Sequence, residues 1–96
     1  MFLVLVNYVK PLEQVDEYLS EHSAFLDRYY ASKKLVFSGR RIPRVGGMFL
    51  VNSNDEAEVH RIIAEDPFHE NGIAEYELIQ FQPTKYDDQF AVFLQS

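Results

Sequence analysis

Close to the start of the chain, residues 2–9 read FLVLVNYV. The run is rich in β-branched and aromatic residues and is shorter than a typical helix, so it predicts a β-strand. Neighbouring side chains of a strand point to opposite faces, and in this strand both sets are apolar. Phe2, Val4, Val6 and Tyr8 form one set, and Leu3, Leu5 and Val9 form the other. A strand with one face in water alternates apolar and polar residues instead, so we expect both faces of this sheet to be covered.

Further along, the run MFLVN at residues 48–52 has the same two-faced pattern. Between and after these runs, Pro11 opens a helix whose apolar stripe recurs at helical spacing, and a capping box of Ser53 and Glu56 opens a second helix. The stripe consists of Leu12, Val15, Leu19, His22, Leu26 and Tyr29. The predicted elements are a strand at 2–9, a helix at 11–32, a strand at 35–40, a loop at 41–47, a strand at 48–52, a helix at 53–65 and a strand at 73–82.

The order β-α-β-β-α-β is the ferredoxin-like α+β arrangement with a four-stranded antiparallel sheet. Two helices cover only one face of such a sheet. At about 25 cal/mol per Å² of apolar surface, leaving the other face in water would cost many kcal/mol. A second copy of the chain is the simplest cover, because two-fold homodimers are the commonest oligomers. We therefore predict a sheet-on-sheet homodimer, with assembly beyond the dimer left open.

Composition limits the classes of function. The chain has 96 residues, a formal net charge of -6 and no cysteine. This length fits one domain, and the missing cysteines exclude disulfides and a thiolate nucleophile. The acidic balance argues against binding nucleic acid. No apolar run reaches the roughly 20 residues of a membrane helix, and no basic segment precedes the first apolar run, so we expect no membrane contact and a cytoplasmic location.

His22 is the first candidate for chemistry, three residues after Leu19 and four before Leu26 on the apolar stripe. We expect its imidazole to face the sheet, where its nitrogens need partners. One interpretation is a core histidine bonded to a backbone carbonyl. The other is a general acid or base at the rim of the sheet.

Asp66 is the second candidate, in the segment DPFHENG at residues 66–72. An aspartate N-cap, a proline at the first helical position and a glycine just past the end describe one helical turn. Alternatively, Asp66 is the carboxylate that orients His22. The two interpretations are compatible, because one carboxylate oxygen can do each job.

Ser38 and Gly39 interrupt an apolar strand, and Arg40, Arg41 and Arg44 follow them. A glycine inside a strand often marks a bulge or the close approach of a ligand. Ser38 is suited to bind a ligand or a neighbouring strand. The arginines are suited to grip a carboxylate, or they form a solvated loop.

Histidines and carboxylates show no metal-binding spacing, and we expect His60 and His69 to be exposed. The sequence also has no Gly-rich phosphate loop and no dinucleotide fingerprint. We therefore predict no metal and no cofactor.

Taken together, these residues resemble the YCII-related family. The matching parts are His22, the Ser38-Gly39 pair, the turn at residues 43–47, Asp66-Pro67-Phe68 and Tyr76, and the likeness extends to about residue 86. The resemblance implies a dimeric α+β barrel with a site centred on His22 and Asp66, with Ser38 as a lining residue. Residues 87–96 form a C-terminal extension outside the pattern, which would close over the cleft or lengthen the dimer contact.

The resemblance also suggests a reaction, because related dimeric barrels include muconolactone isomerase and a chloromuconolactone dehalogenase. The first hypothesis is acid–base catalysis by His22 and Asp66, giving isomerisation, elimination or hydrolysis of a small organic acid or lactone held by an arginine. The second hypothesis is a non-catalytic dimer that binds a metabolite or another protein. The sequence alone does not name a substrate.

Overall fold

The computed structural model describes residues 1–94 and has the predicted α+β architecture. In chain order the elements are β1 (Phe2–Tyr8), α1 (Leu12–Glu17), α2 (Leu19–Ala31), β2 (Leu35–Arg40), β3 (Gly46–Val51), α3 (Glu56–Ala64), α4 (Pro67–Glu70), β4 (Ala74–Gln80) and the 3₁₀ segment η1 (Asp88–Leu94). The sheet is antiparallel in the order β2-β3-β1-β4. This is the ferredoxin-like fold that the order of the sequence patterns predicts.

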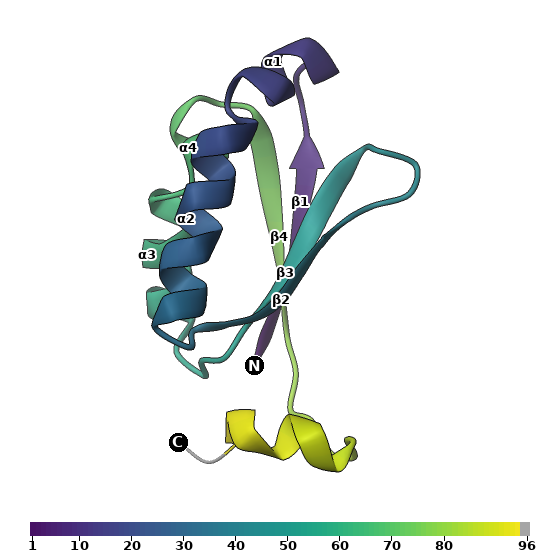
Figure 1. Ribbon diagram of the computed structural model, residues 1–96, viewed down its shortest axis with the longest axis vertical. Helices are drawn as coiled ribbons and strands as arrows, with labels where there is room; N and C mark the ends of the chain where they lie inside the picture. Colours follow the sequence, from purple (N-terminus) through teal and green to yellow (C-terminus); the bar gives the residue numbers. More distant parts are fainter. Residues whose placement is uncertain (95–96) are drawn as a thin grey trace.

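All the helices that pack on the sheet lie on one side of it, as Figure 1 shows. We call this side the covered face and the other side the open face. The covered face carries the hydrophobic core, in which Val4, Phe25 and Phe49 are almost completely buried. The core therefore lies between the sheet and α2, α3 and α4.

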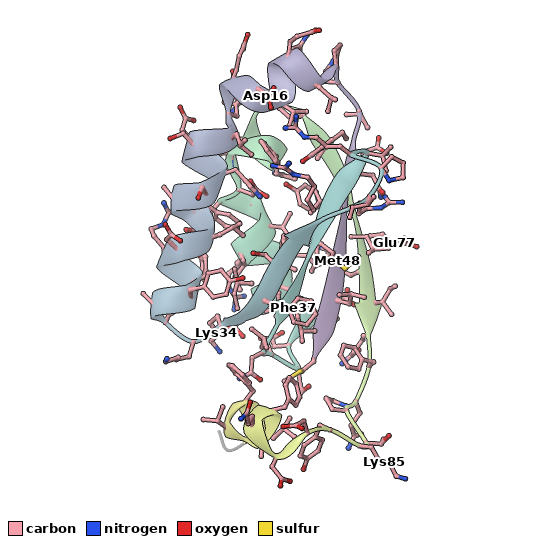
Figure 2. All side chains as sticks on the ribbon, turned by 45° about the vertical axis from the view of Figure 1, so that its right-hand side comes forward. Asp16, Lys34, Phe37, Met48, Glu77 and Lys85 are labelled. Atoms are coloured by element: carbon pink, nitrogen blue, oxygen red, sulfur yellow. The ribbon has the colours of Figure 1, made fainter. Side chains whose placement is uncertain are left out.

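The register of β1 separates the two faces. Phe2, Val4 and Val6 are buried on the covered face, whereas Leu3 and Leu5 are only partly buried on the open face. Leu5 lies between Met48 of β3 and Glu77 of β4. Figure 2 shows Met48 and Glu77 on this side of the molecule. An apolar open face is present, as the two-faced strands predicted, and nothing in residues 1–94 covers most of it.

The long first helix of the prediction is wrong in one respect. It is two helices, because the backbone of Tyr18 leaves the helical region at φ -108° and ψ 4°. The break changes which residues face inward, since Phe25 is the fully buried residue of α2 and Leu12 is 42% exposed. Periodicity alone treats the two segments as one helix and misplaces the centre of the stripe.

The predicted capping box at Ser53 is also wrong. The N-cap of α3 is Asp55, whose side chain accepts a hydrogen bond of 3.0 Å from the backbone N–H of Ala57. Ser53 instead accepts from the N–H of Asp55 at 3.1 Å, which forms a turn ahead of the helix. Both residue types favour caps, so the local sequence does not distinguish them.

The start of β3 differs from its prediction for a local reason. The strand begins at Gly46, two residues before Met48, inside the segment that the sequence predicts as a loop. A Cβ atom on Gly46 would lie 1.8 Å from the carbonyl oxygen of Val6. The glycine therefore permits close approach of β3 to β1, whereas in sequence it looks like a turn residue.

The C-terminal segment lies at the foot of the sheet, beyond the end of β4 (Figure 1). Its residues Tyr86 and Phe90 help to line a groove of about 620 Å³ together with Leu3, Phe37 and Leu50 of the open face. The predicted boundary at residue 86 stays a prediction, and Gln95 and Ser96 of the predicted extension lie outside the described residues. Within residues 1–94, no helix is long and apolar enough to cross a membrane.

Candidate active site

His22 and Asp66 meet on the covered side of the sheet. The Nδ1 atom of His22 and the Oδ1 atom of Asp66 lie 2.8 Å apart. His22 projects from α2, and Asp66 ends the connection between α3 and α4, 44 residues later in the chain. The hydrogen bond that the enzyme hypothesis requires between these two side chains is therefore present.

The carboxylate of Asp66 is completely buried and has three hydrogen-bond partners. Its Oδ1 atom lies near Nδ1 of His22 and also accepts from the backbone N–H of Phe68 at 3.0 Å. Its Oδ2 atom accepts from the hydroxyl of Tyr76 at 2.7 Å. Oδ1 of Asp66 thus both caps α4 and contacts the imidazole. The sequence analysis expected one oxygen to cap the helix and the other to contact His22.

The hydrogen on the His22 ring can be placed from these contacts. The N–H of Phe68 and the O–H of Tyr76 are donors, so Asp66 acts as an acceptor at both oxygens. The third partner, Nδ1 of His22, must then donate. The Nε2 atom has no hydrogen-bond partner among residues 1–94. It is therefore available as an acceptor.

Aromatic packing holds the imidazole plane. The His22 ring stacks on the ring of Phe68, with centroids 4.1 Å apart and planes 6° apart. Phe25 lies on the same helix at a centroid distance of 6.0 Å. The side chain of His22 keeps 15% of its surface exposed, so it is neither sealed in the core nor free in solvent.

A cleft of about 320 Å³ opens beside His22, between α2 and the β2–β3 edge of the sheet. Its wall is mostly apolar, with a few polar side chains. Its lining includes His22, Ser38, Arg40, Phe49 and Phe68. A cleft with apolar walls and few polar groups is the usual form of a small-molecule site.

Ser38 and Arg40 both line this cleft, and their roles as substrate ligands stay predictions. The hydroxyl of Ser38 accepts a hydrogen bond of 2.7 Å from Tyr30. Ser38 pairs with Phe49 and Arg40 pairs with Gly47, so the two side chains share the face of the sheet that the helices cover. Gly39 lies between them in the strand.

The other two arginines are bound to protein groups elsewhere. Arg41 donates to Oδ1 of Asn7 at 2.6 Å, and Arg44 donates to Asp16. The hydrogen bond from Arg44 to Asp16 raises the pKa of the guanidinium. Neither arginine lines the cleft beside His22, and their roles as substrate ligands stay predictions.

Tyr76 is the residue of this cluster to which the sequence analysis gave no role. Burial raises the pKa of its phenol, and the charge of Asp66 raises it further. One signal was present in the sequence, because β4 alternates and places Tyr76 between Glu75 and Glu77, on the inward set. A half-buried tyrosine needs a partner for its hydroxyl, but the pattern does not say which one.

Metal ligands do not gather in the described part of the chain. Residues 1–94 contain no group of three or more His, Cys, Asp or Glu side chains that could hold an ion. His60 and His69 are exposed, as expected, and His60 lies 3.5 Å from Glu56. The absence of a cofactor stays a prediction.

Comparisons with known proteins agree with this fold. Residues 1–82 match the YCII-related domain, and the chain belongs to this family. The resemblance noted in the sequence is thus confirmed. A comparison with curated proteins found no match.

A similar solved structure is 5-chloro-2-hydroxyhydroquinone dehydrochlorinase from Burkholderia phenoliruptrix, in complex with 2,5-dihydroxybenzoquinone. The TM-score is 0.71 at 18% sequence identity, over 85% of this chain and 94% of that chain. At this identity the likeness shows the shared fold.

Proposed function

We propose that this protein is an enzyme that uses His22 and Asp66 for acid–base chemistry on a small organic acid or lactone, by isomerisation, elimination or hydrolysis. The observation that carries the proposal is the orientation of one ring. Nδ1 of His22 is bound to a buried carboxylate at 2.8 Å, while the same imidazole lines a cleft of about 320 Å³. A histidine held in this way offers Nε2 to a bound molecule.

In this proposal His22 removes a proton from the substrate through Nε2 and returns it, or gives it to a leaving group. The imidazolium that forms would lie directly beside the carboxylate of Asp66. An opposite charge at this distance stabilises the charged ring, and the burial of the carboxylate strengthens that attraction. Asp66 therefore orients the base and stabilises its protonated state without taking the proton itself.

Arg40 is the residue that we propose for binding the carboxylate of the substrate. It lines the cleft, whereas Arg41 and Arg44 donate to Asn7 and Asp16. A guanidinium binds a carboxylate through two parallel N–H groups, which would fix the orientation of the ligand. Ser38 would supply one further hydrogen bond.

The similar dehydrochlorinase supports this chemistry indirectly. Its name describes the loss of HCl from a chlorinated hydroxyhydroquinone. Such an elimination needs a group that accepts a proton, which is the role that we propose for His22. Because a fold hosts many functions, the support comes from the site geometry and the likeness together.

We also propose that two copies pack through their open faces. Phe37 and Ile79 on this face are 47% and 43% exposed. Glu77 lies on the edge strand β4, while Arg41 follows β2 in the chain and its guanidinium reaches Asn7 on the central strand β1. A two-fold axis parallel to the strands would place β2 over β4 of the partner and cover the apolar side chains of both open faces. We propose that residues 87–96 lengthen this contact.

A non-catalytic binding dimer is the second candidate, and one observation favours it. Asp66 caps α4 through the N–H of Phe68, so the His22–Asp66 pair would be kept for stability alone. In that case the variant His22→Asn would lower stability and leave ligand binding intact.

The test is a thermal-shift screen with small organic acids and lactones, repeated on His22→Ala, Asp66→Asn and the exposed control His60→Ala. A ligand at 100 times its Kd stabilises the native state by about 2.7 kcal/mol. We expect a ligand whose stabilisation is lost in the first two variants and kept in the control, and which wild-type protein converts to a product. A ligand that binds all four proteins equally, or is never converted, would contradict the enzyme proposal.

A further inference from the structure

The Tyr76 hydroxyl donates a hydrogen bond to Oδ2 of Asp66. This is the carboxylate oxygen that contacts neither the N–H of Phe68 nor the His22 ring. Oδ1 of Asp66 meets Nδ1 of His22 and the N–H of Phe68, and among residues 1–94 Oδ2 accepts only from Tyr76, at 2.7 Å. Asp66 is 0% exposed, so its carboxylate depends on protein donors within the described structure. Without the phenol, Oδ2 would be a buried oxygen with no partner.

Tyr76 is built into a rigid part of the fold. It lies on β4 opposite Val6 of β1, with its ring toward the covered face. Burial and the charge of Asp66 raise the pKa of the phenol, so it remains a neutral donor at physiological pH. The phenol of Tyr76 thus keeps, at this pH, the hydrogen that it donates to Asp66.

We infer that Tyr76 is a positioning residue that fixes the plane of the Asp66 carboxylate and, through it, the tautomer of His22. With both oxygens held, Oδ1 faces Nδ1 of the ring. The tautomer with a bare Nδ1 would place a nitrogen lone pair against Oδ1, which is repulsive. The Nδ1–H tautomer is therefore selected, and Nε2 is left unprotonated toward the cleft.

This inference rests on the proposed function for its chemical consequence, because a fixed bare Nε2 matters to a base. The geometry itself needs no substrate. A purely structural tyrosine would stabilise the domain without any effect on where the ring hydrogen lies. Which ring nitrogen of His22 carries the hydrogen therefore distinguishes a positioning role of Tyr76 from a purely structural one.

The chain offers a matched control on its outer surface. Tyr29 donates to Oε2 of Glu65 at 2.6 Å, the residue next to Asp66. Glu65 also lies 3.7 Å from Arg28, and within residues 1–94 it forms no hydrogen bond or ion pair with a histidine. Tyr29→Phe therefore removes the same kind of hydrogen bond without touching the His22–Asp66 pair.

The experiment is ¹⁵N NMR of the histidine side chains in wild type, Tyr76→Phe and Tyr29→Phe, at a pH where His22 is neutral. Wild type and Tyr29→Phe should show two widely separated ring nitrogens for His22, with the hydrogen on Nδ1. In Tyr76→Phe the two signals should move toward each other, because both tautomers become populated.

Two results would overturn the inference. One is an averaged or Nε2–H ring in wild type, which is decisive even if Tyr76→Phe does not fold. The other is an unchanged Nδ1–H signal in a folded Tyr76→Phe protein. A fixed tautomer with no converted ligand would instead contradict the proposed function and leave this inference standing.

Discussion

The two faces of the sheet are made by the same four strands, but the chain closes only one of them. On the covered face, Val4 and Phe49 are at most 1% exposed, and a buried carboxylate has donors on both oxygens. On the open face, at the neighbouring positions of the same strands, Leu5 and Met48 are partly exposed. The difference shows that alternation alone makes two apolar surfaces, and that the helices decide which of them can hold a polar site.

The largest expected effect is in the core of the covered face. Phe49→Ala should lower the free energy of unfolding by about 3–5 kcal/mol, because a buried ring leaves a cavity. Met48→Ala, on the neighbouring open-face position, should cost about 1 kcal/mol or less in the monomer, since less apolar surface is lost from burial. Urea unfolding at low protein concentration measures both. Equal losses would mean that the two faces are equally buried in one chain.

The two adjacent carboxylates on the helical side sharpen the comparison. Both accept a tyrosine hydroxyl, but Asp66 is buried and the side chain of Glu65 is 53% exposed. Asp66→Ala should cost about 2–4 kcal/mol, because buried donors lose their acceptor. Glu65→Ala should cost about 0–1 kcal/mol. The same urea measurement compares them, and a large loss at Glu65 would contradict the role of burial.

The open face is tested by placing a charge on it. Leu5→Glu should weaken the proposed dimer by about 2 kcal/mol or more, roughly 30-fold in the dissociation constant, because a carboxylate would be buried without a partner beside Glu77. Sedimentation or light scattering gives the mass at several concentrations. The fold should be kept, as judged by circular dichroism. A variant with the same dimer fraction as wild type would mean that the copies do not meet through this face.

The smallest effect is expected for Tyr29, which should contribute to the pH dependence of stability at alkaline pH. Burial raises the pKa of Tyr29 from 10.0 to about 12, with the hydrogen bond to Glu65 as the second cause. The folded state therefore holds this proton longer than the unfolded chain does. The resulting stability is complete below pH 10.0 and is lost as the pH rises toward about 12.

The variant Tyr29→Phe has no phenol to ionise at this position. Its free energy of unfolding should therefore fall less than that of the wild type as the pH rises toward about 12. The measurement is the urea midpoint of wild type and variant at several pH values through this window. Parallel curves for the two proteins would show that Tyr29 does not contribute. The control variant Tyr30→Phe removes another tyrosine of the same helix, whose hydroxyl meets Ser38 and not a carboxylate.

Much of the fold follows from local patterns. The strand β2 has the predicted bounds, and Asp66, Pro67 and Gly72 delimit the short helix α4 as their residue types predict. These predictions hold because caps and turns depend on neighbours in the chain. The break at Tyr18 and the cap at Asp55 were missed because several residues nearby fit the same local rules equally well.

The candidate site shows the same division. His22 and Asp66 were named from a stripe and a turn, their pairing was one of two alternatives, and the family resemblance favoured it; the structure shows the contact. The roles of Arg40, Arg41 and Arg44 could not be separated, because three arginines within five positions differ only in what lies across from them. The sequence likewise did not predict that Tyr76 bonds to Asp66. The alternation of a strand tells on which face of the sheet a side chain lies, but not which residue it contacts.

By itself, the sequence determined the order of the elements, the two apolar faces and the residues able to move a proton. Those properties depend on periods of two and 3.6 residues and on side-chain chemistry, all of which are local. Only the tertiary structure decided that Asp66 is held by Tyr76 and meets His22 across 44 residues, and that Arg40 alone of the three arginines lines the cleft within the described chain. Contacts between distant segments depend on how helices pack on a sheet, and no local pattern contains that geometry.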